Sequence, residues 1–321
     1  MDPEKRIKIA RECGKIHNLI RTEIKEWIKP GLKMIDISNK IESRIKELTL
    51  FDINNPTIAG VGFPTGLSLN ECAAHWTPDP GEKRILKEDD VCKVDYGVQK
   101  EGIIIDSAFT IYFNPKYDKL IEASETSTQI ALKLAGPDAI LGEIGAAVQE
   151  NMESYEIELN NKIIPIKSIK TLTGHQIEPY KIHAGKSVPN YKVNYPERMK
   201  EGEYYAVETF ATTGTGITNE GIPCSHFMID YNKDYNNISL AKKEKKIFQE
   251  IQQKFGTLAF CNRWLDEYNI LKYPKFLKSL VSVDAIKKYP PLNDIKGSYT
   301  SQSEHSILIK DVGIEILSQT K

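Results

Sequence analysis

The chain has 321 residues, of which 40% are hydrophobic and 27% charged, with a formal net charge of −1. This length allows one large or two ordinary domains, and the charge argues against a nucleic-acid protein that depends on a general positive field. No apolar run approaches membrane-spanning length, and the N-terminus has no apolar signal core. Five scattered cysteines without a C-x-x-C pair fit a reducing compartment, so an intracellular protein is expected.

The first sixty residues predict two helices and a short strand. Apolar residues recur at helical spacing over 4–28, as far as the break at Pro30-Gly31. A second helix follows, for which Asp36 is the expected N-cap. Loop residues then lead to a short strand over 58–63.

A β-hairpin is predicted next, from the alternating pattern of 91–98 and the β-branched pattern of 103–113. A turn centred on Lys100-Glu101 would pair Asp95 directly with Asp106, with their Cβ atoms about 4.5–5.5 Å apart. Like charges opposite each other destabilise a sheet, so either one carboxylate keeps its proton or a cation binds. We favour the cation, because further candidate ligands follow downstream.

The rest of the chain alternates between helical and β patterns. A β-rich stretch is expected from about 156 to 230, and the β pattern resumes at Ser306–Lys310. The intervening block is richer in Lys and Asn and interrupts the strand pattern, so we interpret it as an insertion carried by the main domain. The predicted helices of this part cover 116–135, 142–155, 242–253 and 273–280. The fold class is therefore α+β.

Three more candidate metal ligands are His175, Glu208 and Glu304. Glu208 lies in an apolar strand, where an unpaired carboxylate would be costly. Glu304 and His305 are neighbours on a predicted strand and point to opposite faces, so only one of them can join a given site. With the two aspartates, this set has four negative charges, which two divalent cations balance. Its oxygen-rich ligands suit Mn²⁺, Co²⁺ or Fe²⁺ better than a closed structural zinc site.

Other readings of these residue types remain open at this stage. A single buried Asp or Glu in a strand is more often a satisfied structural group, and sequence separation alone cannot bring five residues together. Cys72-x-x-His75 and Cys224-x-His226 could form a zinc pair, although each is half a site with generic spacing. His183, taken alone, is more often a surface or core histidine than a catalytic one.

Several longer stretches form a specific series along essentially the whole chain. They include Phe63-Pro-Thr-Gly-Leu-Ser-Leu-Asn, Cys72-Ala-Ala-His75-Trp-Thr-Pro, Lys93-Val-Asp95-Tyr-Gly, Ile182-His183-Ala-Gly-Lys, Val207-Glu208-Thr-Phe and Tyr289-Pro-Pro-Leu-Asn-Asp-Ile-Lys-Gly. In this order they resemble the methionine aminopeptidases, specifically the type 2 branch. The resemblance implies a pita-bread fold over 1–321, with two pseudo-symmetric halves and a helical insertion over 220–292.

The resemblance also implies roles for individual residues. Two divalent metal ions (Co, Mn or Fe, with Zn as a further option) would be bridged by Asp106 and Glu304. His75 and His183 would lie beside the scissile bond, and Glu208 would also act as general base. The full implied ligand set is Asp95, Asp106, His175, Glu208 and Glu304. The implied methionine pocket comprises Phe63, Gly66, Ile182, Phe210, His226, Ala259, Tyr289 and Leu292.

The function implied is hydrolytic removal of the initiator methionine from proteins with a small second residue. Expected partners are N-terminal methionyl peptides and nascent polypeptides, with transient ribosome contact. The protein is expected to be a cytoplasmic monomer that binds neither DNA nor membranes. One rival is an X-Pro aminopeptidase or prolidase. Those enzymes usually have a separate N-terminal domain, and we expect no room for one before Asp95. The other is a non-catalytic, RNA-associated relative, which lacks the intact ligand set.

Overall fold

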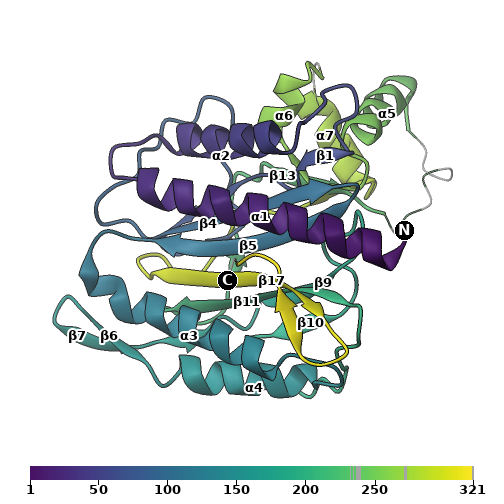
Figure 1. The fold of residues 1–321 in the computed structure, drawn as a ribbon. Helices are drawn as coiled ribbons and strands as arrows, with labels where there is room; N and C mark the ends of the chain where they lie inside the picture. The colour runs from purple at the N-terminus through teal and green to yellow at the C-terminus, as the bar shows by residue number, and fades with distance from the viewer. Residues whose placement is uncertain (232, 234, 236–239, 271–272, 320–321) are drawn as a thin grey trace.

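The computed structural model describes residues 1–231, 233, 235, 240–270 and 273–319. Two β-sheets lie next to each other, and two helices pack against each of them (Figure 1). A further group of helices lies at one end of the first half, at the upper right of Figure 1. The α+β class is confirmed. Within this described part, no helix combines the length and apolar character needed to cross a bilayer.

The first half contains the two predicted N-terminal helices and the predicted hairpin. Its elements are α1 (Pro3–Trp27), α2 (Met34–Leu48), β1 (Ala59–Val61), β2 (Gly66–Leu69), β3 (Cys72–Ala74), β4 (Cys92–Lys100) and β5 (Ile103–Ile111). The expected cap at Asp36 is wrong, because α2 begins at Met34 after Lys33 and Asp36 lies within the first turn. The backbone N–H of Met34 donates to the carbonyl of Arg84 at 2.9 Å, so a neighbouring segment satisfies this helix end.

The hairpin is confirmed, but its register differs from the predicted one. Lys100 pairs with Ile103, so the turn lies at Glu101-Gly102, one position later than expected. Both of these residues have positive φ, which glycine adopts at no steric cost. Asp95 therefore pairs with Ala108, and Asp106 pairs with Gly97. The predicted direct Asp95–Asp106 pair is wrong, but a shift of two positions keeps both side chains on one face as diagonal neighbours.

The second half repeats the arrangement of a sheet with two helices. Its elements are η1 (Pro115–Tyr117), α3 (Asp118–Leu134), α4 (Leu141–Met152), β6 (Glu156–Leu159), β7 (Lys162–Pro165), β8 (Lys167–Ser168), β9 (Thr173–Ile177), β10 (Ser187–Pro189), β11 (Tyr204–Thr212), β17 (Thr300–Ile309) and β18 (Ile314–Ile316). The main sheet has the order β10-β9-β11-β17-β18, with β8 also paired to β11. The predicted helices and β-rich stretch of this half are confirmed.

Hydroxyl side chains join the two sheets where β5 passes β17. Ser306 Oγ accepts from the backbone N–H of Asp106 at 2.9 Å and donates to the carbonyl of the same residue at 2.7 Å. Ser107 Oγ donates to the carbonyl of Glu304 at 2.5 Å. These bonds fix β5 of the first half against β17 of the second, and they do so at two of the predicted ligand residues.

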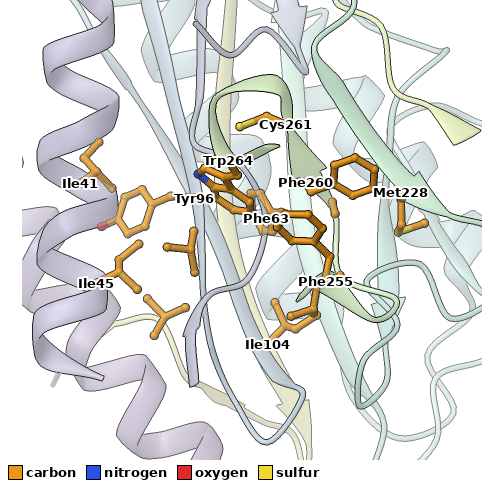
Figure 2. Packing of buried hydrophobic residues seen from close by; sticks show 14 of the residues in the cluster. Ile41, Ile45, Phe63, Tyr96, Ile104, Met228, Phe255, Phe260, Cys261 and Trp264 are labelled. Carbon is orange, nitrogen blue, oxygen red and sulfur yellow. The ribbon is translucent and has the colours of Figure 1, made fainter. Parts of the chain in front are cut away.

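A third group of elements follows β11. It contains β12 (Asn219–Glu220), β13 (His226–Ile229), α5 (Lys242–Phe255), β14 (Phe260–Cys261), α6 (Asn262–Glu267), α7 (Tyr273–Ser282), β15 (Ile286–Lys288) and β16 (Leu292–Asn293). We call the described residues of 226–288 the helical segment. Its core is continuous with that of the first half: Figure 2 shows buried side chains extending from Ile41 through Phe63 to Phe260 and Met228. The segment is therefore packed into the main body of the protein.

Candidate metal and substrate site

One pocket brings together residues from both halves and from the helical segment, with about 650 Å³ of open space. It is lined by all five predicted metal ligands, by His75 and His183, and by seven of the eight predicted methionine-pocket residues. The exception is Leu292, which is outside the lining; it lies in β16 and pairs with Ala74 of β3. The residues of this pocket are scattered from Phe63 to Glu304, so only the fold assembles them.

The two aspartates come from the first sheet. Asp95 lies in the middle of β4 beside Gly66 of β2, and a Cβ at that glycine would lie 3.3 Å from the Asp95 Cβ. Asp106 lies in β5, with 4% of its surface exposed. The Oδ1 atoms of both aspartates are buried and have no hydrogen-bond partner. Each carboxylate thus offers a free oxygen to the pocket.

The two glutamates come from the second sheet, where they are direct partners: Glu208 of β11 pairs with Glu304 of β17. Both are buried, and Glu304 Oε2 has no hydrogen-bond partner. The neighbouring His305 points away, and its Nδ1 lies 2.9 Å from the hydroxyl of Ser318. The alternation of side chains along β17 therefore places Glu304, and not His305, in the pocket.

His175 of β9 completes the group. Its Nε2 lies 3.4 Å from Asp106 Oδ2 and 3.8 Å from Glu208 Oε1. Potential ligand atoms of Asp106, His175 and Glu304 all lie within 4.8 Å of one another. This spacing is small enough for one cation to contact a ligand atom from each of these three residues.

The charge of this cluster is unbalanced without a cation. Burial raises the pKa of Asp106 to about 7, and it raises the pKa of Asp95, Glu208 and Glu304 well above their usual range. The other carboxylates add to the effect in the last three. Buried carboxylates with unpartnered oxygens are costly when ionised. The donor set therefore fits divalent metal ions, which would neutralise the charge and fill the free oxygen positions.

Sequence reasoning missed one polar residue that touches this cluster. Gln302 is buried, and its Nε2 donates to Glu208 Oε2 at 3.0 Å and to Asp95 Oδ2 at 3.3 Å. It lies two positions before Glu304 on β17 and so shares its face. Strand alternation was the signal that could have identified it.

Four further aromatic and imidazole rings line the pocket. His183 lies edge-on to the metal-ligand candidate His175, with 4.4 Å between ring centroids. His75 lies edge-on to Tyr289 at 5.6 Å and to His226 at 5.8 Å. Burial lowers the pKa of His75 to about 4 and that of His183 to about 3. Both imidazoles are therefore neutral near pH 7, and each can donate or accept a hydrogen bond.

The zinc alternative is not supported by the geometry. Cys72 Sγ lies 3.6 Å from the carbonyl of Ala74, and Cys224 Sγ lies 3.3 Å from the carbonyl of His226. Neither cysteine lines the pocket. Across the residues that the structure describes, the cysteines join no cluster suited to a metal ion, and all five are free.

The rest of the pocket is apolar. Phe63 and Phe210 line it from the two halves, and Ala259 lines it from the helical segment. The lining also includes Pro64, Ala74, Leu172 and Met228, which sequence reasoning missed. Met228 follows His226 by two positions in β13, so the period of the strand could have identified it. The pocket thus joins a polar floor to an apolar slot.

Comparison with known proteins identifies relatives that match most of the chain. The model of metallopeptidase family M24 matches residues 8–235. The chain is 45% identical over 309 residues to methionine aminopeptidase 2A of Arabidopsis thaliana, covering 96% of this chain and 69% of that protein. It is also 45% identical over 314 residues to methionine aminopeptidase 2 of Saccharomyces cerevisiae, covering 97% of this chain and 74% of that protein.

Solved structures share the fold at lower identity. A thermophilic Arx1 superposes with a TM-score of 0.83 at 17% identity, covering 99% of this chain and 91% of that one. Methionine aminopeptidase from Thermotoga maritima gives a TM-score of 0.65 at 19% identity, with coverage of 98% and 97%. Prolidase from Pyrococcus furiosus gives a TM-score of 0.58 at 13% identity, covering 99% of this chain and 64% of that one. The expected pita-bread fold is confirmed, and the chain belongs to metallopeptidase family M24 and, within it, to the type 2 methionine aminopeptidases.

Proposed function

We propose that this protein removes the N-terminal methionine from peptides and nascent proteins whose second residue is small. The observation that carries the proposal is the pocket itself: it is lined by four carboxylates, three of them buried, together with His175, and apolar side chains line the rest. The 45% identity to type 2 methionine aminopeptidases supports the same reaction.

Five residues would hold two divalent metal ions, with Asp106 and Glu304 bridging them. The unpartnered oxygens of Asp95, Asp106 and Glu304 support this assignment. The oxygen-rich donor set favours Mn²⁺, Co²⁺ or Fe²⁺, with Zn²⁺ as a further option. When bound, such ions supply Lewis acidity, which lowers the pKa of a water molecule and polarises the scissile carbonyl.

Glu208 is the proposed general base. It takes a proton from the attacking water and returns it to the leaving amine. Burial and the neighbouring carboxylates raise the pKa of Glu208 in the metal-free cluster. The amide of Gln302 donates to one oxygen of Glu208 at 3.0 Å and so fixes the orientation of this carboxylate.

His75 and His183 are the proposed donors to the peptide bond. Each is a neutral imidazole and can donate an N–H to the oxygen that becomes negative in the transition state. They approach the pocket from different segments, because His75 follows β3 and His183 follows the ligand strand β9. Two donors on separate supports can hold a peptide bond in one orientation.

The apolar slot is the proposed methionine pocket. Phe63, Phe210 and Met228 offer the sulfur and aromatic contacts that an unbranched thioether favours. The free α-amine would lie at the carboxylate floor, which would restrict cleavage to N-terminal residues. We further propose that residues 220–292 form an insertion of the type 2 branch, that the protein acts as a cytoplasmic monomer, and that it contacts the ribosome transiently.

Peptide cleavage with defined metals tests this function. Purified protein is stripped with a chelator, reloaded separately with Mn²⁺, Co²⁺, Fe²⁺ or Zn²⁺, and assayed on Met-Ala-Ser and on Ala-Pro peptides. We expect release of methionine from Met-Ala-Ser with at least one metal and no cleavage of Ala-Pro. Preferential cleavage of Ala-Pro would favour a prolidase-type enzyme. Absence of both metal binding and cleavage would favour a non-catalytic relative.

A further inference from the structure

A buried ion pair outside the pocket joins α2 to the helical segment. Arg263 NH1 donates to Glu42 Oε2 at 2.9 Å, and Arg263 NH2 donates to Glu42 Oε1 at 2.8 Å. The two side chains are only 8% and 5% exposed. Although burial alone would raise the pKa of Glu42, the charge and hydrogen bonds of Arg263 hold it below its usual value. The pair is therefore ionised and doubly hydrogen-bonded.

The carboxylate of Glu42 has further partners on both sides. Its Oε1 accepts from the backbone N–H of Thr65 at 3.2 Å, and its Oε2 accepts from the indole N–H of Trp264 at 2.8 Å. Thr65 lies between Pro64 and Gly66, and both of these line the pocket. Glu42 thus holds one wall of the pocket through its hydrogen bond to the backbone of Thr65.

The guanidinium of Arg263 holds two other segments. Its Nε donates to the carbonyl of Pro78 at 2.9 Å, and its NH2 donates to the hydroxyl of Thr77 at 3.2 Å. These residues directly follow the segment of His75, which has φ of 67°, a backbone conformation that must be fixed by its surroundings. Arg263 itself follows Ala259, another wall residue, by four positions.

We propose that Glu42 and Arg263 are a positioning pair that fixes the walls of the methionine pocket relative to one another and so sets its selectivity for the N-terminal side chain. Neither residue touches the pocket, so each acts through the segments that it holds. The proposal rests on the proposed function of the same pocket. A buried ion pair adds little net stability compared with apolar replacements, so stability alone does not account for this one.

The first test compares Glu42→Gln with a matched control whose ion-pair partner lies on the same helix as Glu42. The amide keeps an oxygen for Thr65 but removes the charge that faces Arg263. The control is Glu23→Gln, because Glu23 makes a similar two-bond pair with Arg44 of α2 at 2.8 and 2.9 Å, half-exposed and away from the pocket. Each variant is loaded with metal, and kcat and KM are measured on Met-Ala-Ser and Leu-Ala-Ser well below its melting temperature.

The preference for Met over Leu is the ratio of the two kcat/KM values. For Glu42→Gln we expect this ratio to fall by about 10-fold or more, because apolar pockets discriminate between similar side chains on that scale. KM for Met-Ala-Ser should rise more than kcat falls, and metal content should not change. Glu23→Gln should keep the wild-type preference. A purely structural role would lower the melting temperature and leave the preference intact, and that result would overturn the proposal.

A second variant covers the case in which Glu42→Gln does not fold. Replacement of both partners, Glu42→Met with Arg263→Met, leaves no unpaired buried charge, so it should fold and still lose the preference. A folded double variant with wild-type preference would refute the positioning role. If the wild type cleaves no methionyl peptide, the proposed function fails and this proposal fails with it. If the wild type is selective and both variants are equally selective, only this proposal fails.

Discussion

Glu208 and Glu304 face each other as direct partners across β11 and β17, in the centre of the second sheet. Like charges in this position destabilise a sheet. Asp95 and Asp106 present the same conflict from the first sheet as diagonal neighbours. The two sheets bring four carboxylates together, and hydroxyl bonds at Ser306 and Ser107 hold the sheets in that position. The fold therefore keeps a charge imbalance that divalent cations relieve.

Asp106→Asn should reveal the bridging role. If Asp106 bridges two ions as proposed, its carboxylate serves both of them, so the variant should bind less metal and lose nearly all activity on Met-Ala-Ser. The measurement is metal content after dialysis, together with the rate of methionine release. Full activity in this variant would contradict the bridging assignment.

The same variant should have the opposite effect on the metal-free protein. The pKa of Asp106 is raised from its usual value of 3.8 to about 7, so the folded state binds more protons than the unfolded state between these values. Stability therefore falls as pH rises through about 7. Metal-free Asp106→Asn should melt above metal-free wild type at pH 8, and each 1 kcal/mol of this difference corresponds to roughly 1.5 °C for a protein of this size. The difference should shrink as pH falls below 7, and a constant difference would contradict the charge argument.

His75→Ala and His183→Ala should separate catalysis from metal binding. Each variant should retain its metal, because neither imidazole is among the five proposed ligands. Each should lose roughly 10²–10⁴-fold in kcat/KM, the usual range for lost acid–base or oxyanion assistance. Metal loss from either variant would mean that its histidine is a ligand.

The sequence predicted the types of the main elements better than it predicted their pairing. The Asp95–Asp106 hairpin was identified from its alternation, but a turn one position later changed which residues face each other. The Glu208–Glu304 pair was not predicted, because the register of two strands far apart in the chain depends on the whole sheet. Gln302 was missed because a glutamine has no metal-ligand pattern of its own. Leu292 was carried over by resemblance, whereas the backbone of β16 places it beside the pocket wall.

Tyr231→Phe should test how the helical segment supports His183. The hydroxyl of Tyr231 donates to the carbonyl of His183 at 2.5 Å, so it holds the backbone of a proposed donor. A neutral hydrogen bond contributes about 0.5–1.5 kcal/mol, so we expect kcat to fall by roughly 2- to 10-fold with unchanged metal content. An unchanged kcat would show that His183 is positioned without this contact.

Ala259→Leu should test the wall of the methionine pocket. Ala259 is 4% exposed and lines the slot from the helical segment, so a larger side chain would occupy space that the methionine side chain needs. Overpacking of a well-filled site costs about 1–3 kcal/mol. We expect KM for Met-Ala-Ser to rise by roughly 10-fold, with metal content unchanged. Ala241→Leu, at an exposed position of the same segment, is the control and should keep the wild-type KM.

The wild type should also reject β-branched and charged first residues. If it instead cleaves N-terminal Leu, Lys and Met with similar efficiency, the assigned pocket does not select methionine.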